Sequence, residues 1–360
     1  MNIMRVNTGH KNFLKWESDM KTVPVEDAVG KVLFHDVTQI VPGQFKGRAF
    51  KKGHVLQQAD IPRLLDLGKA NIYVFDTTAG MIHENAAAQR IAAASTGGGL
   101  RLSEPVEGKV DLVATQSGLL TVNTDALYRI NDVEDVMFAT LHTHYPVHSS
   151  QPVAGTRIIP LFTDKERIER VEQICREHFP VVQVKSFRPL KIGIVTTGSE
   201  IFHGRIEDKF GPVLREKFSS LGSRVIKQVL VSDDIRMTVD AIKELIRDGA
   251  EFVAVTGGMS VDPDDQTPAS IRAAGGTVVT YGAPVLPGAM FMLTHIGEIP
   301  VVGLPGCVMY YKASIFDLVV PRLLAGEAVT RADIVAMGHG GFCSNCPDCR
   351  YPICSFGKTG

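Results

Sequence analysis

Short apolar runs and helical periodicities alternate along the second half of the chain. Buried-strand patterns lie at 192–196, 224–231, 252–255, 277–279 and 299–302. Helical patterns lie between them at 211–221, 235–247, 270–274 and 308–324. This alternation predicts an α/β fold with a doubly wound, mostly parallel sheet. In such a sheet, ligands bind at the carboxyl ends of the strands.

The first half of the chain has a different pattern. Residues 1–99 show mixed α and β signals, ending in an alanine-rich helix over 84–94 and a glycine-rich hinge over 95–99. Residues 100–188 contain short alternating runs that predict a β-rich domain, with one amphipathic helix over 164–179. We therefore expect four parts: 1–99, 100–188, an α/β domain over 189–330, and a tail over 331–360.

Composition narrows the classes of function. The 360 residues include 38 basic and 39 acidic residues, giving a net charge of −1, so no overall field favours nucleic acid or an anionic membrane. The chain has neither a secretory signal pattern at its start nor an apolar run of membrane-spanning length. We expect a cytoplasmic protein.

The stretch 256–268, Thr-Gly-Gly-Met-Ser-Val-Asp-Pro-Asp-Asp-Gln-Thr-Pro, carries the strongest chemical signal. Gly257 and Gly258 follow a predicted strand, so backbone amides can approach an anion with no Cβ in the way. Ser260 is a further polar candidate, and the aspartates that follow, Asp265 among them, suit a divalent cation. A simple βα turn with helix-capping residues is the alternative explanation.

Other polar residues follow predicted strands in the same way. Thr197, Gly198 and Ser199 come after the first strand and suit a phosphate or a ring edge, or form an ordinary turn. Asp233 and Asp234 come after the second strand, where one of them is expected to cap the next helix.

Four ordered segments resemble the molybdopterin-binding domain of molybdopterin adenylyltransferases and molybdopterin molybdenumtransferases. They are 195–200 (Val-Thr-Thr-Gly-Ser-Glu), 207–212 (Glu-Asp-Lys-Phe-Gly-Pro), the 256–268 loop, and 303–306 (Gly-Leu-Pro-Gly). The resemblance covers Lys191 to about Ala325. It implies molybdopterin or the molybdenum cofactor as ligand, molybdate or a nucleotide as further substrate, Mg²⁺, and a homo-oligomer.

Residue by residue, the resemblance assigns catalytic roles to Asp233 and Asp265. It assigns ligand contacts to the following residues: Thr197, Gly198, Ser199, Asp208, Gly257, Gly258, Ser260, Gly288, Gly303, Pro305 and Gly306. The chain departs from the molybdenumtransferase pattern at Cys307 and Val308, which replace Asn-Pro, and at Asp262, which replaces Gly. The β-barrel that follows this domain in full transferases is not expected. The domain is a hybrid of the two types.

The tail holds four of the six cysteines, Cys343, Cys346, Cys349 and Cys354, as Cys-x2-Cys-x2-Cys-x4-Cys. In a reducing compartment this clustering favours metal over disulfides. Zn²⁺ is the first expectation and an iron–sulfur cluster the second, with a disordered thiol-bearing tail as the alternative. Because the tail follows the α/β domain, its loss is expected to spare the fold. His142 and His144 are better explained as surface histidines than as metal ligands.

Two functions compete. The first is an enzyme of molybdenum cofactor biosynthesis, either inserting molybdenum or transferring a nucleotidyl group to the pterin phosphate. The second is a non-catalytic sensor or carrier of molybdopterin or finished cofactor. A dinucleotide-dependent oxidoreductase is disfavoured because no Gly-x-Gly-x-x-Gly turn follows the first strand.

Overall fold

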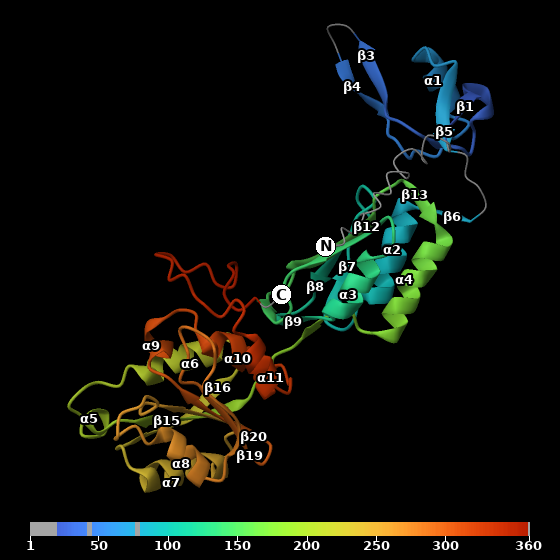
Figure 1. Ribbon diagram of the computed structural model, residues 1–360. Coiled ribbons are helices and arrows are strands. Elements are labelled where there is room, and N and C mark those ends of the chain that lie inside the picture. Colours follow the sequence, from blue (N-terminus) through green and yellow to red (C-terminus); the bar gives the residue numbers. More distant parts are fainter. Residues whose placement is uncertain (1–19, 42–44, 76–79, 359–360) are drawn as a thin grey trace, which may run out of the picture.

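The computed structural model describes residues 20–41, 45–75 and 80–358. Most of the amino-terminal segment examined for a secretory signal, residues 1–19, lies outside the described residues. The chain forms three successive parts, here called the amino-terminal lobe (20–75), the middle lobe (80–185) and the carboxy-terminal lobe (188–358) (Figure 1). In the described part of the chain, no helix has the length and apolar character needed to cross a bilayer.

The amino-terminal lobe is small. Its three-stranded sheet has the order β1-β5-β2, and a separate hairpin joins β3 to β4. Its elements are β1 (Met20–Pro24), η2 (Val25–Asp27), β2 (Val32–Leu33), β3 (Val37–Val41), β4 (Phe45–Phe50), α1 (Asp60–Asp66) and β5 (Asn71–Phe75). Leu33, Leu64 and Val74 are fully buried in its core.

The middle lobe combines short antiparallel sheets with three helices. Its sheets have the orders β10-β12-β8-β7, β11-β9-β14 and β13-β6. Its elements are β6 (Met81–His83), α2 (Glu84–Ser95), β7 (Leu100–Leu102), β8 (Val110–Ala114), β9 (Gly118–Val122), α3 (Thr124–Asn131), β10 (Val136–Thr140), β11 (Tyr145–Val147), β12 (Pro152–Ile158), β13 (Phe162–Asp164), α4 (Lys165–Glu177) and β14 (Val182–Lys185).

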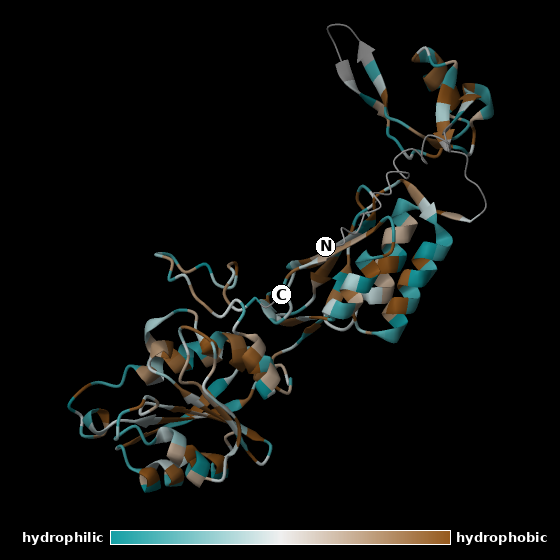
Figure 2. Cartoon of the chain, viewed as in Figure 1, coloured by the Kyte–Doolittle hydropathy of each residue, from teal (hydrophilic) through white to brown (hydrophobic). Residues whose placement is uncertain are grey.

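Helix α2 corrects the expected boundary near residue 99. Its buried Ala88, Ile91 and Ala92 pack in the same core as Ile168 and Val171 of α4. Figure 2 shows hydrophobic and hydrophilic residues alternating around both helices, as expected for helices with one buried face. The predicted hinge at 95–99 therefore lies inside the middle lobe, and this lobe is mixed α and β rather than mainly β.

The carboxy-terminal lobe is an α/β unit around a six-stranded sheet of order β16-β15-β17-β20-β19-β18. The first four strands in this order are parallel, whereas β19 runs antiparallel to both of its neighbours, β20 and β18. Its strands are β15 (Lys191–Thr197), β16 (Arg224–Val231), β17 (Phe252–Thr256), β18 (Thr277–Tyr281), β19 (Met292–Ile296) and β20 (Ile299–Leu304). Its helices are α5 (Ser199–Phe202), α6 (Phe210–Ser220), α7 (Ile235–Arg247), α8 (Thr267–Ala273), α9 (Cys307–Tyr310), α10 (Ile315–Leu324) and α11 (Arg331–Ala336).

Both faces of this sheet are covered, and β17 shows why its sequence is apolar throughout. Successive side chains of a strand point to opposite faces. Phe252 therefore packs with the residues of α6 and α10, including Phe218 at a ring-centroid distance of 5.5 Å, whereas Val253 packs with the residues of α7 and α8. A strand buried on both sides needs apolar residues at every position.

The tail is part of this lobe, which corrects the expectation that it lies outside the domain. Phe356 is only 3% exposed and belongs to the core beside α10. Tyr351 donates a hydrogen bond to the Asp317 carbonyl over 2.9 Å. At its start, Phe342 pairs with Leu286 in a parallel bridge. These contacts hold the tail although its residues 341–358 form neither helix nor strand.

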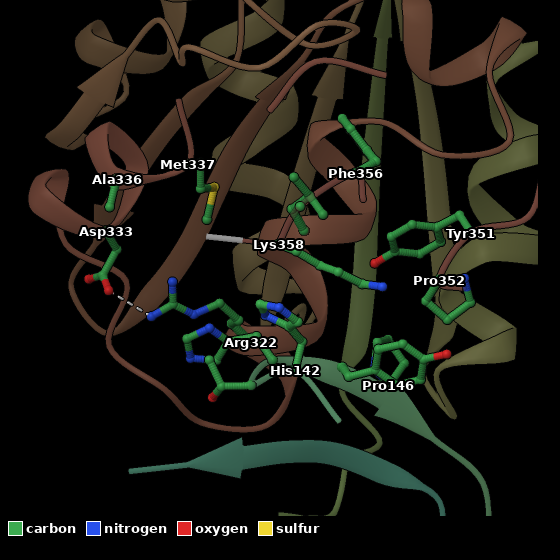
Figure 3. A pocket seen from close by; sticks show the side chains of 15 residues that line it. His142, Pro146, Arg322, Asp333, Ala336, Met337, Tyr351, Pro352, Phe356 and Lys358 are labelled. Atoms are coloured by element: carbon green, nitrogen blue, oxygen red, sulfur yellow. Dashed lines mark hydrogen bonds and ion pairs between the residues drawn. The ribbon is translucent and has the colours of Figure 1, made fainter. Parts of the chain in front are cut away.

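Glu327 joins the middle and carboxy-terminal lobes. Its carboxylate pairs with the Lys185 ammonium at 3.2 Å, the His144 ring at 3.3 Å and the Arg322 guanidinium at 3.1 Å. A cavity of about 90 Å³ lies beside this cluster. In Figure 3, His142 and Pro146 of the middle lobe line one side of the cavity, and Tyr351, Pro352 and Lys358 of the tail line another.

Replacing Glu327 with glutamine is expected to weaken the contact between the lobes. Burial raises the pKa of Glu327, but the hydrogen bond and charge of His144 and the hydrogen bond from Lys185 outweigh burial and hold this pKa at about 2. A lowered carboxyl pKa stabilises the fold above the unfolded pKa of 4.5, and this stabilisation is lost as the pH falls toward 2. Equilibrium unfolding at pH 7 should show that Glu327→Gln lowers the free energy of unfolding by on the order of 3 kcal/mol. The exposed Glu298→Gln is the control; equal stabilities would contradict the prediction.

Candidate functional site

Four loops meet at one edge of the carboxy-terminal sheet. The parallel strands β15, β16, β17 and β20 end at Thr197, Val231, Thr256 and Leu304. Their registers are aligned: Thr197 lies opposite Val231, and Thr256 lies opposite Leu304. The loops that begin with Gly198, Ser232, Gly257 and Pro305 therefore start side by side. We call this edge the crevice.

Two glycines form the centre of the crevice. Gly257 and Gly258 have φ angles of +89° and +53°, which L side chains rarely adopt. A Cβ on Gly257 would lie 2.1 Å from the Thr197 carbonyl oxygen, so only glycine lets these two loops approach. Thr267 ties the loop down, because its hydroxyl donates to the Gly257 carbonyl at 2.8 Å.

The backbone amides that follow are free to bind a ligand. Among the described residues, the N–H groups of Gly258, Met259 and Ser260 donate no hydrogen bond. Met259 is nonetheless buried, at 4% exposure, and Ser260 is exposed beside it. Native backbone amides are nearly always satisfied by protein, water or ligand. Consecutive free amides after a Gly-Gly turn are donors that can bind an anion together.

The two adjacent aspartates after β16, Asp233 and Asp234, form hydrogen bonds with different parts of the lobe. Asp234 caps α7 by accepting from the Met237 amide at 2.8 Å. Asp233 instead reaches across to the neighbouring loop, accepting from the Ser199 amide at 2.8 Å and from the Ser199 hydroxyl at 3.1 Å. The Ser199 and Ser232 hydroxyls lie 2.8 Å apart. Sequence reasoning missed Ser232, although its position directly before the aspartates is the signal that identifies it.

Asp265 is held within its own loop. One carboxylate oxygen accepts from the Asp262 amide at 3.1 Å, and the Asp265 amide donates to the Asp262 carbonyl at 2.9 Å. The other carboxylate oxygen forms no hydrogen bond in the described chain. Asp265 is half-buried, whereas Asp262 and Asp264 are exposed.

Asp208 holds the start of α6. Its carboxylate accepts from the Phe210 amide at 2.9 Å and the Gly211 amide at 3.1 Å. The Gln228 amide donates both to Asp208, at 2.6 Å, and to the Thr196 hydroxyl, at 3.0 Å. Gln228 was not predicted from the sequence, because its position inside a strand carries no motif. These contacts use most of the carboxylate's hydrogen-bonding capacity.

The remaining predicted glycines permit close packing near the crevice. A Cβ on Gly303 would lie 2.7 Å from the Met259 sulfur, and a Cβ on Gly288 would lie 2.4 Å from the Ile315 Cβ. Pro305 is buried, and Gly306 is exposed at the start of α9.

Sequence comparison finds a match to a known family within this lobe. Residues 193–325 match the family described as "Probable molybdopterin binding domain". The chain is therefore similar to this family over residues 193–325. Residues 22–76 match a domain of unknown function (DUF8806).

Relatives share only parts of their length with this chain. The molybdopterin adenylyltransferase of Pyrococcus furiosus is 34% identical over 85 residues, which are 24% of this chain and 50% of that protein. A CinA-like protein of Acidobacterium capsulatum is 33% identical over 93 residues, 26% of this chain and 22% of that protein. The chain thus spans half or less of the length of these relatives. The tungsten cofactor synthesizing protein MoaB of Pyrococcus furiosus aligns with a TM-score of 0.32 and 23% identity, covering 40% of this chain and 98% of that structure.

Outside the crevice, the candidate metal ligands are less well organised. Across residues 20–41, 45–75 and 80–358, no three His, Cys, Asp or Glu side chains are placed as a metal-binding group. His144 is engaged by Glu327. The four tail cysteines line a single cavity without forming a ligand cluster, so the structure gives the predicted zinc or iron–sulfur centre no direct support.

Proposed function

We propose that the crevice binds molybdopterin through its phosphate. The single observation that carries this proposal is the convergence of four loops on one strand edge, with free amides after Gly257. Amides and loop hydroxyls can hold a phosphate without a cationic side chain. On the β15–β16 side, the Ser232 hydroxyl becomes a donor to the ligand when it turns away from Ser199. The domain family and the adenylyltransferase relative support the same ligand class and a role in molybdenum cofactor biosynthesis.

The residues also fit Mg²⁺. Asp233 and Asp265 each use one carboxylate oxygen in loop hydrogen bonds and keep the other free, and Mg²⁺ is usually bound by one or two carboxylates together with substrate phosphates. When bound, the ion would neutralise phosphate charge. The chain's own contribution is positioning: Ser199 orients Asp233, and the Asp262 amide orients Asp265.

We propose nucleotidyl transfer to the pterin phosphate as the reaction, ahead of molybdenum insertion. The support is the 34% identity to the adenylyltransferase over 85 residues. One observation favours the alternative, a non-catalytic carrier or sensor: Asp208 is occupied with capping α6, which leaves fewer free carboxylates for catalysis. A homo-oligomeric state and a cytoplasmic location stay predictions.

Replacing Asp265 with asparagine should leave the fold intact, because the amide oxygen can still accept from Asp262. The charge that holds the cation is removed, so turnover should fall at least about 100-fold. A coupled assay with molybdopterin, Mg²⁺ and nucleotide measures this effect, and Asp264→Asn is the control because Asp264 is exposed in the same loop. Normal turnover by Asp265→Asn would remove Asp265 from the mechanism. Tight ligand binding without turnover in the unmodified protein would support the alternative function, a non-catalytic carrier or sensor.

A further inference from the structure

All four tail cysteines open into one cavity of about 210 Å³. Cys343 and Cys354 are half-buried against the core beside α10, whereas Cys346 and Cys349 are exposed. The facing wall is formed by Tyr310–Ala313. We call this space the thiol cavity.

The thiol cavity lies close in sequence to one loop of the crevice, and the tail contacts the neighbouring loop between β18 and β19. Its wall at Tyr310–Ala313 is separated from the Gly303–Gly306 turn only by the short helix α9. The tail also binds the loop that contains Gly288: the Cys343 amide donates to the Leu286 carbonyl at 2.8 Å, and the Leu286 amide donates to the Gly341 carbonyl at 2.8 Å. A movement of the tail would therefore reach the Gly288 loop through these two backbone hydrogen bonds.

The cysteine segment has little order of its own. Among the described residues, the backbone amides of 344–349 donate no hydrogen bonds to other backbone groups, and Asn345 has a φ angle of +50°. The segment is also too polar to be held by burial, since residues 344–350 are all exposed. Four thiols in a weakly held segment are typical of a site that a thiophilic ion organises.

The other two cysteines, Cys175 and Cys307, differ from the tail cysteines in their surroundings and in their access to the cavity. Cys175 is fully buried in the middle lobe, and burial raises the pKa of its thiol to about 11. Cys307 lies at the start of α9 and does not line the cavity. Only the tail cysteines share an accessible space.

We propose that the thiol cavity binds one thiophilic divalent cation, with Zn²⁺ as the reference ion, and that this ion strengthens ligand binding in the crevice. Zn²⁺ replaces four thiol protons, giving one tetrathiolate complex and four released protons. Binding includes a local rearrangement, because the four described thiols line one cavity without being placed as a metal-binding group. The bound ion then fixes the tail, and with it the loop at Leu286 that the tail holds by two backbone hydrogen bonds. The second half of this proposal rests on the proposed function.

Metal binding is tested first, without any crevice ligand. The reduced, metal-free full chain is titrated with Zn²⁺ in competition with a chromophoric chelator, and proton release is followed in parallel. We expect one ion per chain, and an affinity about 100-fold lower or weaker still for Cys346→Ser and Cys349→Ser. Ser355→Ala, which lines the same cavity without removing a thiol, should bind like the unmodified chain. Three results would overturn the proposed site. They are the absence of stoichiometric zinc binding, the formation of an iron–sulfur cluster instead, and an equal zinc affinity in all variants.

The coupling is tested by titrating molybdopterin into the zinc-free and zinc-loaded protein. Affinity should rise about 5- to 100-fold with zinc in the unmodified chain and in Ser355→Ala, and should not respond in Cys346→Ser. An unchanged affinity despite stoichiometric zinc would overturn the coupling. Gly257→Ala should retain zinc binding, so failure of the crevice proposal and failure of the metal site give different results.

Discussion

Gly257→Ala is expected to lose molybdopterin binding by about 100-fold or more. The new Cβ would lie 2.1 Å from the Thr197 carbonyl oxygen, so the β15 and β17 loops must separate. Their separation moves the free amides at Gly258–Ser260 away from the phosphate, and each lost charge-assisted hydrogen bond is worth about 1.5–3 kcal/mol. Isothermal titration of purified protein with molybdopterin measures the loss.

Gly249→Ala is the matched control for this experiment. Gly249 has a φ angle of +90°, close to that of Gly257, but a Cβ there has nothing within 4 Å. Both variants share the backbone strain of roughly 1–2 kcal/mol that alanine meets at positive φ. Only Gly257→Ala adds the clash between the loops. If both variants bound equally well, the close approach at Gly257 would have no part in ligand binding.

Phe356→Ala is expected to destabilise the carboxy-terminal lobe by about 3–5 kcal/mol. Phe356 is 3% exposed in the core beside α10, where its ring meets Tyr351 at a centroid distance of 6.1 Å. Its removal leaves a cavity that the surrounding helices cannot fill completely. Chemical denaturation followed by far-ultraviolet circular dichroism measures the change.

Ile353→Ala serves as the control in the same tail. Ile353 is 76% exposed, so its truncation should change stability by no more than about 0.5 kcal/mol. Removal of the whole segment from Cys343 should destabilise the lobe at least as much as Phe356→Ala. A truncated chain with unchanged stability would show that the tail is dispensable for the fold.

The alternation of strands and helices from Lys191 onward could be predicted from the sequence because β15, β17 and β20 are largely buried on both faces and therefore mostly apolar. The meeting of the four loops could be predicted because their glycines and polar residues follow those strands directly, whereas their role in ligand binding stays a prediction. Local pattern did not reveal Gln228 and its bond to Asp208, because that contact joins two segments through side chains alone.

The sequence-based predictions for two regions, helix α2 and the tail, were wrong for the same reason. Helix α2 was assigned to the amino-terminal part, but its core partners lie on α4, far along the chain. The tail lacks any periodicity, so nothing local predicted that Phe356 would be buried against α10. In both cases, packing against residues far along the chain determines where the segment lies. The sequence pattern of the segment itself does not indicate that position.

Mass spectrometry of the small molecules that co-purify anaerobically with the protein tests the central claim most directly. The unmodified chain should carry a phosphorylated pterin at up to one equivalent, and Gly249→Ala should carry the same compound. Gly257→Ala, purified in parallel, should carry none. A different ligand in the unmodified chain, or the same pterin retained by Gly257→Ala, would contradict the assignment of the crevice as the molybdopterin site.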